Sequence, residues 1–360
     1  MLRRIGTYVR RNHLALFALF FALGGASFAA GSKLLPPNSV GTRQVVNHSL
    51  LRRDFALGQI PRGSQGPRGP QGPPGVRGAQ GVQGAQGVKG DPTYRRTILV
   101  SPVSDNESAN GQVLRDALAS ITDAASNKPY LVKLEPGTYF MGGTGLQMKP
   151  YVDLEGSGVL QTLILATVVA DTSGAVIGAS RSQLRWLSVQ NDLPPPTNAL
   201  MGSIAIYAEG SQGSVSLDGV RAFAAGGTHA VGMLVDGAAP TIERSSLEAK
   251  SFVSAMFPEG LPSEGLRLSN TDGVPSLTVR VRDSEISADT YGIRALNALT
   301  VNIDGSRVSG TTQAVTVTGP AAAHIGASQV AGPVLTSDGG TLTCAQSYDG
   351  SYTDLGPACA

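Results

Sequence analysis

A strict three-residue period between Gly63 and Pro92 constrains this chain more than any other feature of its sequence. The stretch reads GSQ GPR GPQ GPP GVR GAQ GVQ GAQ GVK GDP, with glycine first in all ten triplets. Only glycine fits at the axis where three polyproline-like chains wind together, so the period predicts a collagen triple helix and a homotrimer. Proline holds only five of the twenty other positions. A solvated, extended linker therefore remains the alternative interpretation.

The charges of the chain divide close to the end of this tract. The 360 residues carry a formal net charge of +2, but residues 1–96 contain 14 Lys and Arg against 2 Asp and Glu, and residues 97–360 contain 14 against 24. The C-terminal part is acidic, which argues against a nucleic-acid partner. The apolar content of the whole chain, 41%, is sufficient for a core, and its 46 glycines with only 5% aromatic residues favour a thin, repetitive β architecture.

Residues 1–30 have the layout of an export signal. An apolar run from Leu14 to Ala30 follows a segment with four arginines, and small residues at Ser27 and Ala29 suit cleavage after Ala29. The run has 17 residues, at the short limit of a membrane span, so an uncleaved anchor is the alternative. Both interpretations predict an extracellular or cell-surface location, with membrane contact only through residues 14–30.

A polar segment at residues 31–62 precedes the collagen-like tract at residues 63–92. Its stretch Asn38–Gln44, NSVGTRQ, lies between a short signal and collagen triplets. This arrangement resembles secreted actinobacterial collagen-like proteins. The resemblance covers the N-terminal part alone and implies export, not a chemistry. Val45–Phe55 is either a short helix that helps to register three chains or a disordered spacer.

Residues 93–339 contain repeated strand-forming segments. Six segments carry apolar residues at a first and a sixth place, and successive sixth places are 33, 25, 39, 22 and 22 residues apart. This spacing predicts the coils of a β-solenoid with loops of varying length. The fourth place holds serine in the last four segments, which we interpret as a stack of hydroxyls between coils. The apolar pairs are Leu184/Val189, Leu217/Ala222, Ile242/Leu247, Val281/Ile286, Ile303/Val308 and Ile325/Val330, and the serines are Ser245, Ser284, Ser306 and Ser328.

The start of this region predicts a cap for the solenoid. Apolar residues at helical spacing over Asn110–Ser126 predict an amphipathic helix, between strands at Arg96–Val103 and Tyr130–Leu134 and before a turn at Glu135–Tyr139, EPGTY. This order of elements, continued by short strands at 153–158 and 162–164, resembles the pectin lyase-like superfamily, especially its pectinesterase-like members. The resemblance implies a mainly β fold, a right-handed parallel β-helix whose open end is covered by the helix.

Residues 340–360 form a C-terminal tail that contains both cysteines of the chain. Cys344 and Cys359 are fifteen residues apart. In an exported protein, such a local pair favours an intrachain disulfide over links between the chains of a trimer. This disulfide is expected to tie the Tyr348–Tyr352 loop across the last coil.

The sequence contains no established catalytic motif. Asn270–Gly273, NTDG, matches the first active-site motif of polygalacturonases, but the aspartate pair that those inverting enzymes also need is absent. A turn is the simpler interpretation of these four residues. The pectinesterase signature DFIFG is absent, and no spacing groups Asp218 and Asp236 with an arginine into a lyase site with calcium.

His229 and His324 have no Cys or carboxylate at metal-ligand spacing, so we expect no metal site. We likewise expect no cofactor, with Ca²⁺ unsupported. Whether the protein is an enzyme stays open at this point, and a non-catalytic role is favoured.

Trp186 is the residue that favours ligand binding. It is the single tryptophan and occupies the third place of its segment, where other segments carry variable and often polar residues. An indole exposed on a flat β face can stack on a sugar ring, so we expect a carbohydrate site at Trp186, Arg185 and Arg221. Burial under the loop at residues 194–196 is the alternative. The insertion Ser251–Glu264 is either a lip over one face or a locally packed loop.

Together these features predict an exported, collagen-stalked β-helix protein. Its expected role is adhesion or recognition of an extracellular or cell-wall polysaccharide, without catalysis. The alternative is a polysaccharide lyase, hydrolase or esterase with an unidentified site. A phage-spike-like depolymerase is a third interpretation, against which the export signal argues.

Overall fold

A computed structural model describes most of the region after the collagen-like tract and a short part of the segment before it. The described residues are 41, 43, 45–56, 58–59, 94, 96–193, 202–210, 215–250, 262–271, 273–274 and 277–359. The chain divides into two compact units, residues 1–86 and 87–360. The predicted export signal and the Gly-X-Y tract lie outside the described residues and remain predictions, as does the proposed domain division.

In the first unit, the described residues contain one helical turn. The 3-10 helix η1 (Arg52–Asp54) begins where the Leu51 N–H donates to the Asp54 carboxylate at 2.7 Å. Helix formation over Val45–Phe55 is thus limited to this turn. Within the described parts of the chain, no helix is both long and apolar enough to span a membrane.

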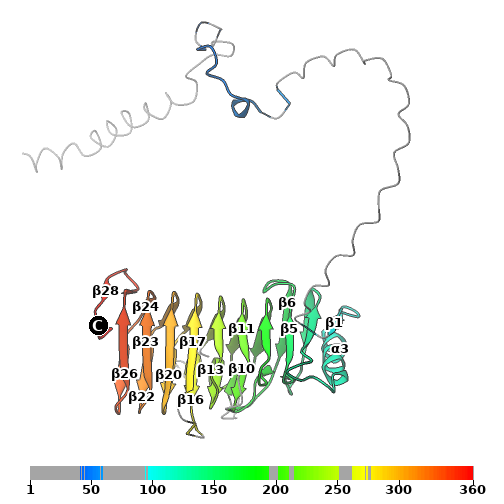
Figure 1. Cartoon of the computed structure of the whole chain (residues 1–360), viewed down its shortest axis with the longest axis vertical. Helices are drawn as coiled ribbons and strands as arrows, with labels where there is room; N and C mark the ends of the chain where they lie inside the picture. The colour runs from blue at the N-terminus through cyan, green and yellow to red at the C-terminus, as the bar shows by residue number, and fades with distance from the viewer. Residues whose placement is uncertain are drawn as a thin grey trace, which may run out of the picture. The chain divides into compact units, whose positions relative to one another are not determined.

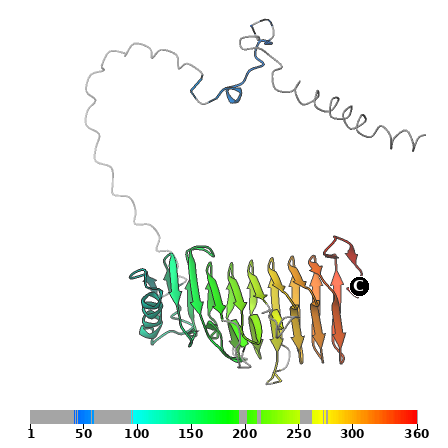
Figure 2. The same cartoon turned by 180° about the vertical axis from the view of Figure 1, so that it is seen from behind.

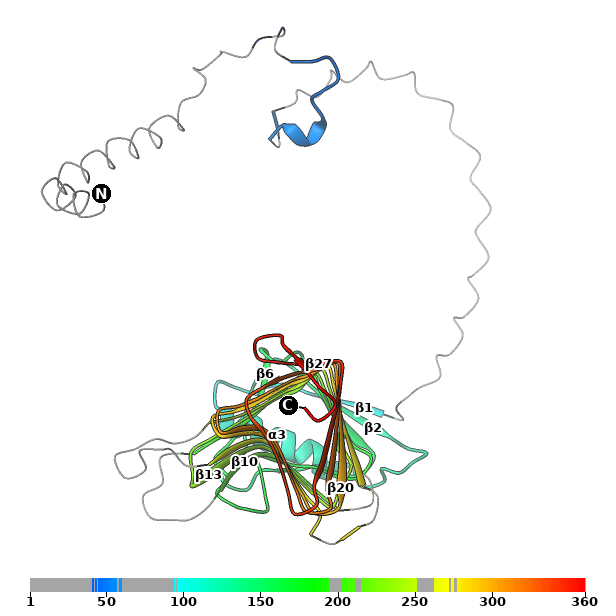
Figure 3. The same ribbon diagram turned by 90° about the vertical axis from the view of Figure 1, so that its left-hand side faces the viewer.

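The second unit is a right-handed parallel β-helix, as the sequence predicts (Figures 1 and 2). Each complete coil contributes one strand in turn to sheet I, sheet II and sheet III, and the strands of successive coils pair in parallel. Figure 3, viewed along the axis, shows the three sheets as the three sides of the coil.

The strands follow the same order in every coil. Sheet I consists of β1 (Arg96–Val100), β2 (Tyr130–Leu134), β5 (Val152–Glu155), β8 (Gln183–Arg185), β11 (Ser216–Asp218), β14 (Thr241–Glu243), β17 (Leu277–Arg282), β20 (Leu299–Asp304), β23 (Ala322–Gly326) and β26 (Thr341–Ala345). Sheet II consists of β3 (Gly137–Phe140), β6 (Thr162–Ala166), β9 (Ser188–Asp192), β12 (Arg221–Ala225), β15 (Ser246–Lys250), β18 (Glu285–Ala288), β21 (Arg307–Gly310), β24 (Gln329–Ala331), β27 (Ser347–Asp349) and β28 (Asp354–Leu355). Sheet III consists of β4 (Leu146–Gln147), β7 (Val176–Ile177), β10 (Gly202–Glu209), β13 (His229–Asp236), β16 (Ser263–Ser269), β19 (Tyr291–Leu296), β22 (Gln313–Thr318) and β25 (Val334–Ser337).

The predicted repeat gives the observed register. The first-place residues pair in sheet I from Leu184 through to Ile325, and the sixth-place residues pair in sheet II from Val189 to Val330. All twelve are at most 2% exposed. A one-residue slip would turn every apolar side chain to the outside, so burial of these two rows fixes the pairing of the coils.

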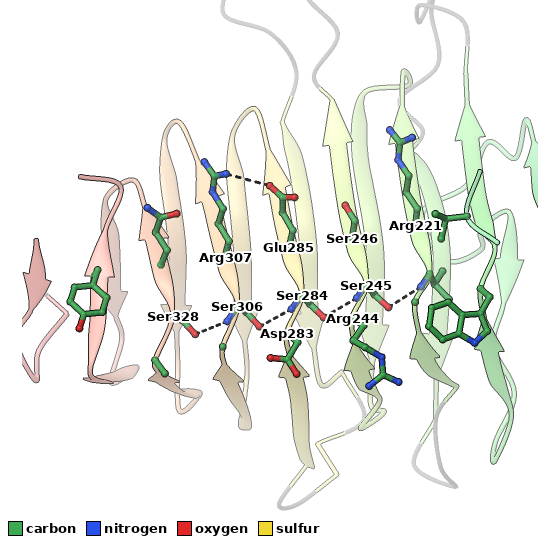
Figure 4. A pocket seen from close by; sticks show the side chains of 18 of the residues that line it. Arg221, Arg244, Ser245, Ser246, Asp283, Ser284, Glu285, Ser306, Arg307 and Ser328 are labelled. Atoms are coloured by element: carbon green, nitrogen blue, oxygen red, sulfur yellow. Dashed lines mark hydrogen bonds and ion pairs between the residues drawn. The ribbon is translucent and has the colours of Figure 1, made fainter. Parts of the chain in front are cut away.

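The serine stack is confirmed and continues one coil further. In the sharp turn between sheets I and II, each buried serine accepts the backbone N–H of the equivalent residue one coil earlier, at 3.0–3.4 Å. Each hydroxyl donates to the carbonyl two residues before it, at 2.6–3.1 Å. Ser347 is the additional member of the stack (Figure 4 shows the others).

Replacing one serine of the stack should destabilise the solenoid. In a Ser306→Ala variant, the buried N–H of Ser284 loses its acceptor. We expect the free energy of unfolding to fall by about 1–3 kcal/mol, the cost of an unsatisfied buried donor. Ser309→Ala, in the strand β21 that follows this turn, is the matched control and should change stability by less than about 0.5 kcal/mol. Equal effects of the two substitutions in denaturant titrations would contradict this assignment.

The capping helix is present, but it begins and ends earlier than predicted. α3 spans Glu107–Ser120 instead of Asn110–Ser126. The Asn106 side chain accepts the N–H groups of Ser108 and Ala109, which fixes the start. At the other end Ile121 is extended, so the chain leaves the helix there. The helix packs on β3 and β1 and closes the first coil.

The predicted turn at Glu135–Tyr139 is largely a strand. β3 begins at Gly137 and pairs with β6, and the Tyr139 side chain is fully buried. Its hydroxyl donates to the carbonyls of Val100 and Glu135 at 3.1 and 3.0 Å. Because the apolar ring needs an inward position, burial overrides the turn tendency of the Pro-Gly pair.

The tail closes the other end of the solenoid, and the predicted intrachain disulfide is confirmed. Cys344 and Cys359 are bonded, and both are buried against the last coil. Between them, β27 turns back into β28 in an antiparallel pair. The disulfide therefore covers the apolar interior that the final coil would otherwise expose.

Candidate functional site: a groove along one corner of the solenoid

The corner between sheets I and II has the same backbone in every coil from β8 onward. The third-place residue at this corner has a positive φ in seven successive coils, between 46° and 62°. This left-handed conformation allows a sharp turn and directs the side chains outward. The third-place row consists of Trp186, Gly219, Arg244, Asp283, Gly305, Ala327 and Gln346.

A second outward row runs beside the first. The residue two positions further on lies at or next to the start of each strand of sheet II, and these residues pair with one another from coil to coil. The buried serines lie between the two rows. The fifth-place row consists of Ser188, which is buried, and of Arg221, Ser246, Glu285, Arg307, Gln329 and Tyr348.

Residues of both rows, all but Gln346 and Ser188, line a groove of about 980 Å³ (Figure 4). It crosses the six coil intervals from Trp186 to Tyr348, which at about 4.8 Å per strand spacing makes it on the order of 29 Å long. Its floor carries the serines and small residues such as Gly305 and Ala327. An extended chain ligand can therefore approach the backbone closely along the whole corner.

Aromatic side chains stand at both ends of the groove. Trp186 at one end is 45% exposed. At the other end Tyr348 is 43% and Tyr352 is 78% exposed. Exposed aromatic rings offer an apolar face and a polar edge, the combination that stacks on sugar rings while leaving hydrogen bonds in water.

The position of Trp186 depends on the next coil. A Cβ atom added to Gly219 would lie 2.6 Å from the Trp186 Cε3 atom, so the indole rests directly on this glycine. Gly219 also has φ +62°, which disfavours a side chain. The indole is thus held against the corner with part of its surface open to the groove. The loop at residues 194–196, the alternative cover for Trp186, lies outside the described residues.

Three arginines provide hydrogen-bond donors between the aromatic ends. Arg221 lies 3.4 Å from Glu248, Arg244 lies 2.5 Å from Asp218, and Arg307 lies 3.8 Å from Glu285. The arginine side chains are 49–57% exposed. Ion pairs this exposed contribute at most about 1 kcal/mol, so a ligand hydroxyl or carboxylate can replace a carboxylate partner at little cost.

The stacked serines of the groove are not arranged as nucleophiles. All five serines of the stack donate their hydroxyl proton to a backbone carbonyl, and no histidine is among the residues that line the groove. A serine nucleophile needs an adjacent base to accept that proton. Asp283 and Glu285 are the acidic side chains of the lining, and Glu285 pairs with Arg307.

Of the three residues proposed from the sequence, the structure brings two together. Trp186 and Arg221 both line the groove. Arg185 lies instead on the outer face of sheet I, where it pairs with Glu155 at 2.9 Å and lies over the Tyr94 ring at 5.5 Å. Its side chain is only 19% exposed. Adjacent residues of a strand and turn point in different directions, which explains why sequence proximity to Trp186 was a poor guide here.

A second hollow, of about 430 Å³, lies on the outer side of sheet III. It contains several polar side chains that the sequence had left without a role, among them His229, Asp236 and Arg267. His229 lies 3.9 Å from Asp171, and the Asp236 carboxylate accepts the N–H and hydroxyl of Thr271. Next to the hollow, the buried Glu264 lies 3.2 Å from Arg294 and 3.8 Å from Arg267. These partners satisfy part of the polar groups, whereas the Glu264 Oε2 and Arg267 Nε atoms are buried without a hydrogen-bond partner among the described residues.

The NTDG stretch lies at the edge of this second hollow. The Asn270 side chain is buried, donating to the carbonyls of Val274 and Ala298 and accepting the Val274 N–H. These bonds are those of a side chain that holds a turn, in line with the turn interpretation. Asp272 lies outside the described residues. Across the described residues there is no cluster of three or more His, Cys, Asp or Glu that could hold a metal ion.

Burial of His229 predicts a pH-dependent stability. Desolvation, with Arg267 as a further cause, lowers its pKa below the ordinary 6.5 in spite of the opposing Asp171 and Glu264 charges. The unfolded chain therefore binds more protons than the folded chain as pH falls through 6.5, so stability is full above this value and decreases below it. In His229→Gln, the loss of stability between pH 7.5 and pH 5 should be smaller than in the wild type.

Denaturant titrations at the two pH values measure this difference. His324→Gln is the control, since His324 is an exposed histidine that contacts Thr343 on sheet I. A His229→Gln variant with an unchanged pH dependence would refute the role of His229.

The sequence matches no protein-family profile and no curated protein. Among solved structures, the chain is similar to pectin methylesterase PemA from Erwinia chrysanthemi, with 12% identity over 73% of this chain and 91% of that chain and a TM-score of 0.40. It is also similar to the A-module of the mannuronan C-5 epimerase AlgE4 from Azotobacter vinelandii, with 13% identity over 73% and 92% of the two chains and a TM-score of 0.36. A pectin methylesterase in complex with a hexasaccharide has 11% identity, 73% and 91% coverage and a TM-score of 0.38.

Several groove residues were missed from the sequence although a signal for them existed. Arg307, Glu285 and Gln329 occupy the fifth place of the same repeat that places the serines. Tyr348 and Tyr352 were assigned only to the disulfide loop. The signal is the repeat itself, because a buried fourth place puts its two neighbours on the outside.

Proposed function

We propose that the protein is an exported recognition protein that binds an extended polysaccharide in the corner groove, without catalysis. Trp186 stacks on a sugar ring at one end, and Tyr348 and Tyr352 do so at the other. Arg221, Arg244 and Arg307 donate hydrogen bonds to sugar hydroxyls or carboxylates between them. The observation that supports this most is the pair of continuous outward rows with exposed aromatic side chains at both ends.

The shape of the groove favours a chain ligand over a small molecule. Small-molecule pockets enclose most of their ligand, whereas this groove is open and repeats its lining once per coil. The groove contains three arginines as well as Asp283 and Glu285, so its electrostatic potential is neither strongly positive nor strongly negative. A neutral or weakly acidic polysaccharide therefore fits it better than a highly charged polyanion.

The non-catalytic part of the proposal is supported by the serines and by the acidic side chains. Each stacked hydroxyl is committed to the backbone, and Glu285 has an arginine partner. A polysaccharide lyase, hydrolase or esterase remains the alternative function, for which the polar hollow on sheet III with His229, Asp236 and Arg267 is the better position.

The collagen-like tract gives the proposal its context. Three heads on one stalk would bind a repeating polysaccharide at several points, so that a weak affinity per groove becomes effective by avidity. The export signal would place the heads outside the cell, where cell-wall and extracellular polysaccharides are found.

An array of plant and microbial cell-wall polysaccharides tests both claims, polysaccharide binding and the absence of catalysis. We expect the purified full chain to bind a subset of neutral or weakly acidic glycans, and we expect no new reducing ends, unsaturated products, methanol or acetate on incubation with them. Turnover that is lost on Asp236→Asn would show that the protein is an enzyme. Absence of binding to every glycan on the array would remove the recognition function.

A further inference from the structure

The outer face of sheet III changes from apolar to charged between β13 and β16. Two outward rows cross these strands in register, one with Ile204, Val231, Glu264 and Tyr291, the other with Tyr207, Leu234, Arg267 and Arg294. The four members from β10 and β13 form an apolar cluster that is separate from the main core. Three of the four members from β16 and β19 are charged. This boundary suits a ligand that has an apolar face and several polar groups.

The hollow of about 430 Å³ on this face lies at the boundary between the two halves. Its lining combines polar groups with an apolar surface, and includes Asp171, His229, Asp236 and Arg267 as well as Tyr207, Leu234 and Leu296. Pockets for small molecules typically have about 300–1,000 Å³, with a few polar groups on a largely apolar wall. The hollow therefore has the size and lining for a small ligand, in contrast to the long corner groove.

Arg267 has a hydrogen-bond donor without an acceptor among the described residues. This donor is its Nε atom, which is buried. Its Nη1 atom lies 3.8 Å from the Glu264 carboxylate, an ion pair that is too long for a hydrogen bond. The buried Glu264 accepts from Arg294 at 3.2 Å through Oε1, whereas its Oε2 atom has no partner in the described part of the chain. Buried polar groups are normally hydrogen-bonded, so this donor and this acceptor beside a hollow indicate a ligand site.

The other polar groups of the hollow can also bind a ligand. Asp171 accepts the Gly202 N–H at 2.9 Å, but its side chain is 60% exposed. Asp236 accepts the Thr271 hydroxyl at 2.7–2.8 Å. An ionised carboxylate has about four acceptor positions, so both groups can accept further hydrogen bonds. Because desolvation holds the pKa of His229 below its ordinary 6.5, its neutral ring provides one donor and one acceptor at pH 7.

We propose that the sheet III hollow binds a single neutral sugar unit, as a second ligand site besides the corner groove. A hydroxyl can donate to a carboxylate and accept from a guanidinium at the same time, and a sugar carries several hydroxyls on a ring with apolar C–H faces. In this complex the ring lies on Tyr207 and Leu234, with its hydroxyls at Arg267, Asp171 and Asp236. Two carboxylates against one guanidinium in the lining disfavour an anionic sugar.

NMR titration of the full chain with neutral monosaccharides tests the proposal. The probes are glucose, galactose, mannose, xylose and N-acetylglucosamine, each as the free sugar and as the methyl glycoside, which represents the terminal unit of a glycan. The chain has four histidines, and His229→Gln identifies the imidazole signal that reports on the hollow. We expect at least one probe to shift this signal saturably, with a Kd on the order of millimolar, and to leave His324 unchanged. An unshifted His229 signal with every probe at about 100 mM would overturn the proposal.

Substitutions separate this site from the corner groove, with which it shares none of the described lining residues. Arg267→Lys keeps a positive charge beside Glu264 but removes the guanidinium donors, so we expect the sugar affinity to fall by at least about tenfold. Asp171→Asn, at an exposed position, should also weaken binding. Arg280→Lys, at an exposed position of β17 in sheet I, and Trp186→Ala should leave the affinity within about twofold of the wild type.

Two results of these titrations would overturn the proposal. One is an unchanged sugar affinity in both Arg267→Lys and Asp171→Asn. The other is a loss in Trp186→Ala that Arg267→Lys does not reproduce, which would place the sugar in the corner groove. The inference is independent of polysaccharide binding by that groove, so the glycan array and the sugar titration can fail separately.

Discussion

Replacing Cys344 and Cys359 together by alanine should lower the free energy of unfolding by about 3 kcal/mol, the value that the chain-entropy relation gives for a closed loop of about fifteen residues. Both sulfurs are buried at the end of the last coil, so the substitution also exposes part of the apolar interior. The coils of a solenoid contact only their neighbours, and the loss should therefore be concentrated at the C-terminal end.

Denaturant unfolding and amide hydrogen exchange measure these two effects. We expect faster exchange in β26 and β24 of the double variant and little change in β2 and β5. Reduction of the wild-type disulfide should reproduce the result. A loss of less than 1 kcal/mol, or faster exchange spread evenly over all coils, would show that the disulfide does not act as the C-terminal cap.

Trp186→Ala should weaken polysaccharide binding by at least about tenfold, since a tryptophan in a contact surface commonly contributes about 2 kcal/mol or more. The indole is nearly half-exposed and lies at one end of the groove, while its other contacts are with Gly219. The fold should be retained, because the third-place backbone is kept by other residues in the neighbouring coils. Affinity for the strongest glycan of the array, measured by titration calorimetry, gives the fold-change.

Arg185→Ala is the matched control for this substitution. Arg185 precedes Trp186 in the sequence but points to the outer face of sheet I, where it contacts Glu155 and Tyr94. Its removal should leave the affinity within about twofold of the wild type, well under the tenfold that corresponds to 1.4 kcal/mol. Larger loss of binding for Arg185→Ala than for Trp186→Ala would move the site from the groove to the outer face of sheet I.

Much of the solenoid could be predicted because the residues of its core recur in the sequence at a repeated spacing. The apolar first and sixth places and the serine between them recur at positions that pair in register, so a pattern along the sequence is also a pattern in space. Sheet III was not predicted from the repeat, because insertions of different lengths precede its strands. Its outer side also carries the apolar side chains of Ile204, Tyr207 and Leu234, which blur the alternation expected of a strand with one exposed face.

The candidate site was predicted only in part for a different reason. Trp186 stood out by its residue type, but the arginines and tyrosines of the groove are common residues whose importance comes from being stacked on successive coils. Arg244 and Arg307, for example, are far apart in the sequence and line one groove only because two coils of the solenoid separate them in space. Such neighbourhoods follow from the register, which must be known before the rows can be assembled.

Hydroxyl-radical footprinting of the full chain, with and without the strongest glycan of the array, tests most directly whether the corner groove is the binding site. The exposed aromatic side chains at its ends, Trp186, Tyr348 and Tyr352, are reactive probes, and Leu335 is an exposed reference outside the groove. We expect the glycan to protect the three aromatic residues and to leave Leu335 unchanged. Protection of His229 on sheet III, with the three aromatic residues still oxidised at the unbound rate, would contradict a polysaccharide site in the groove.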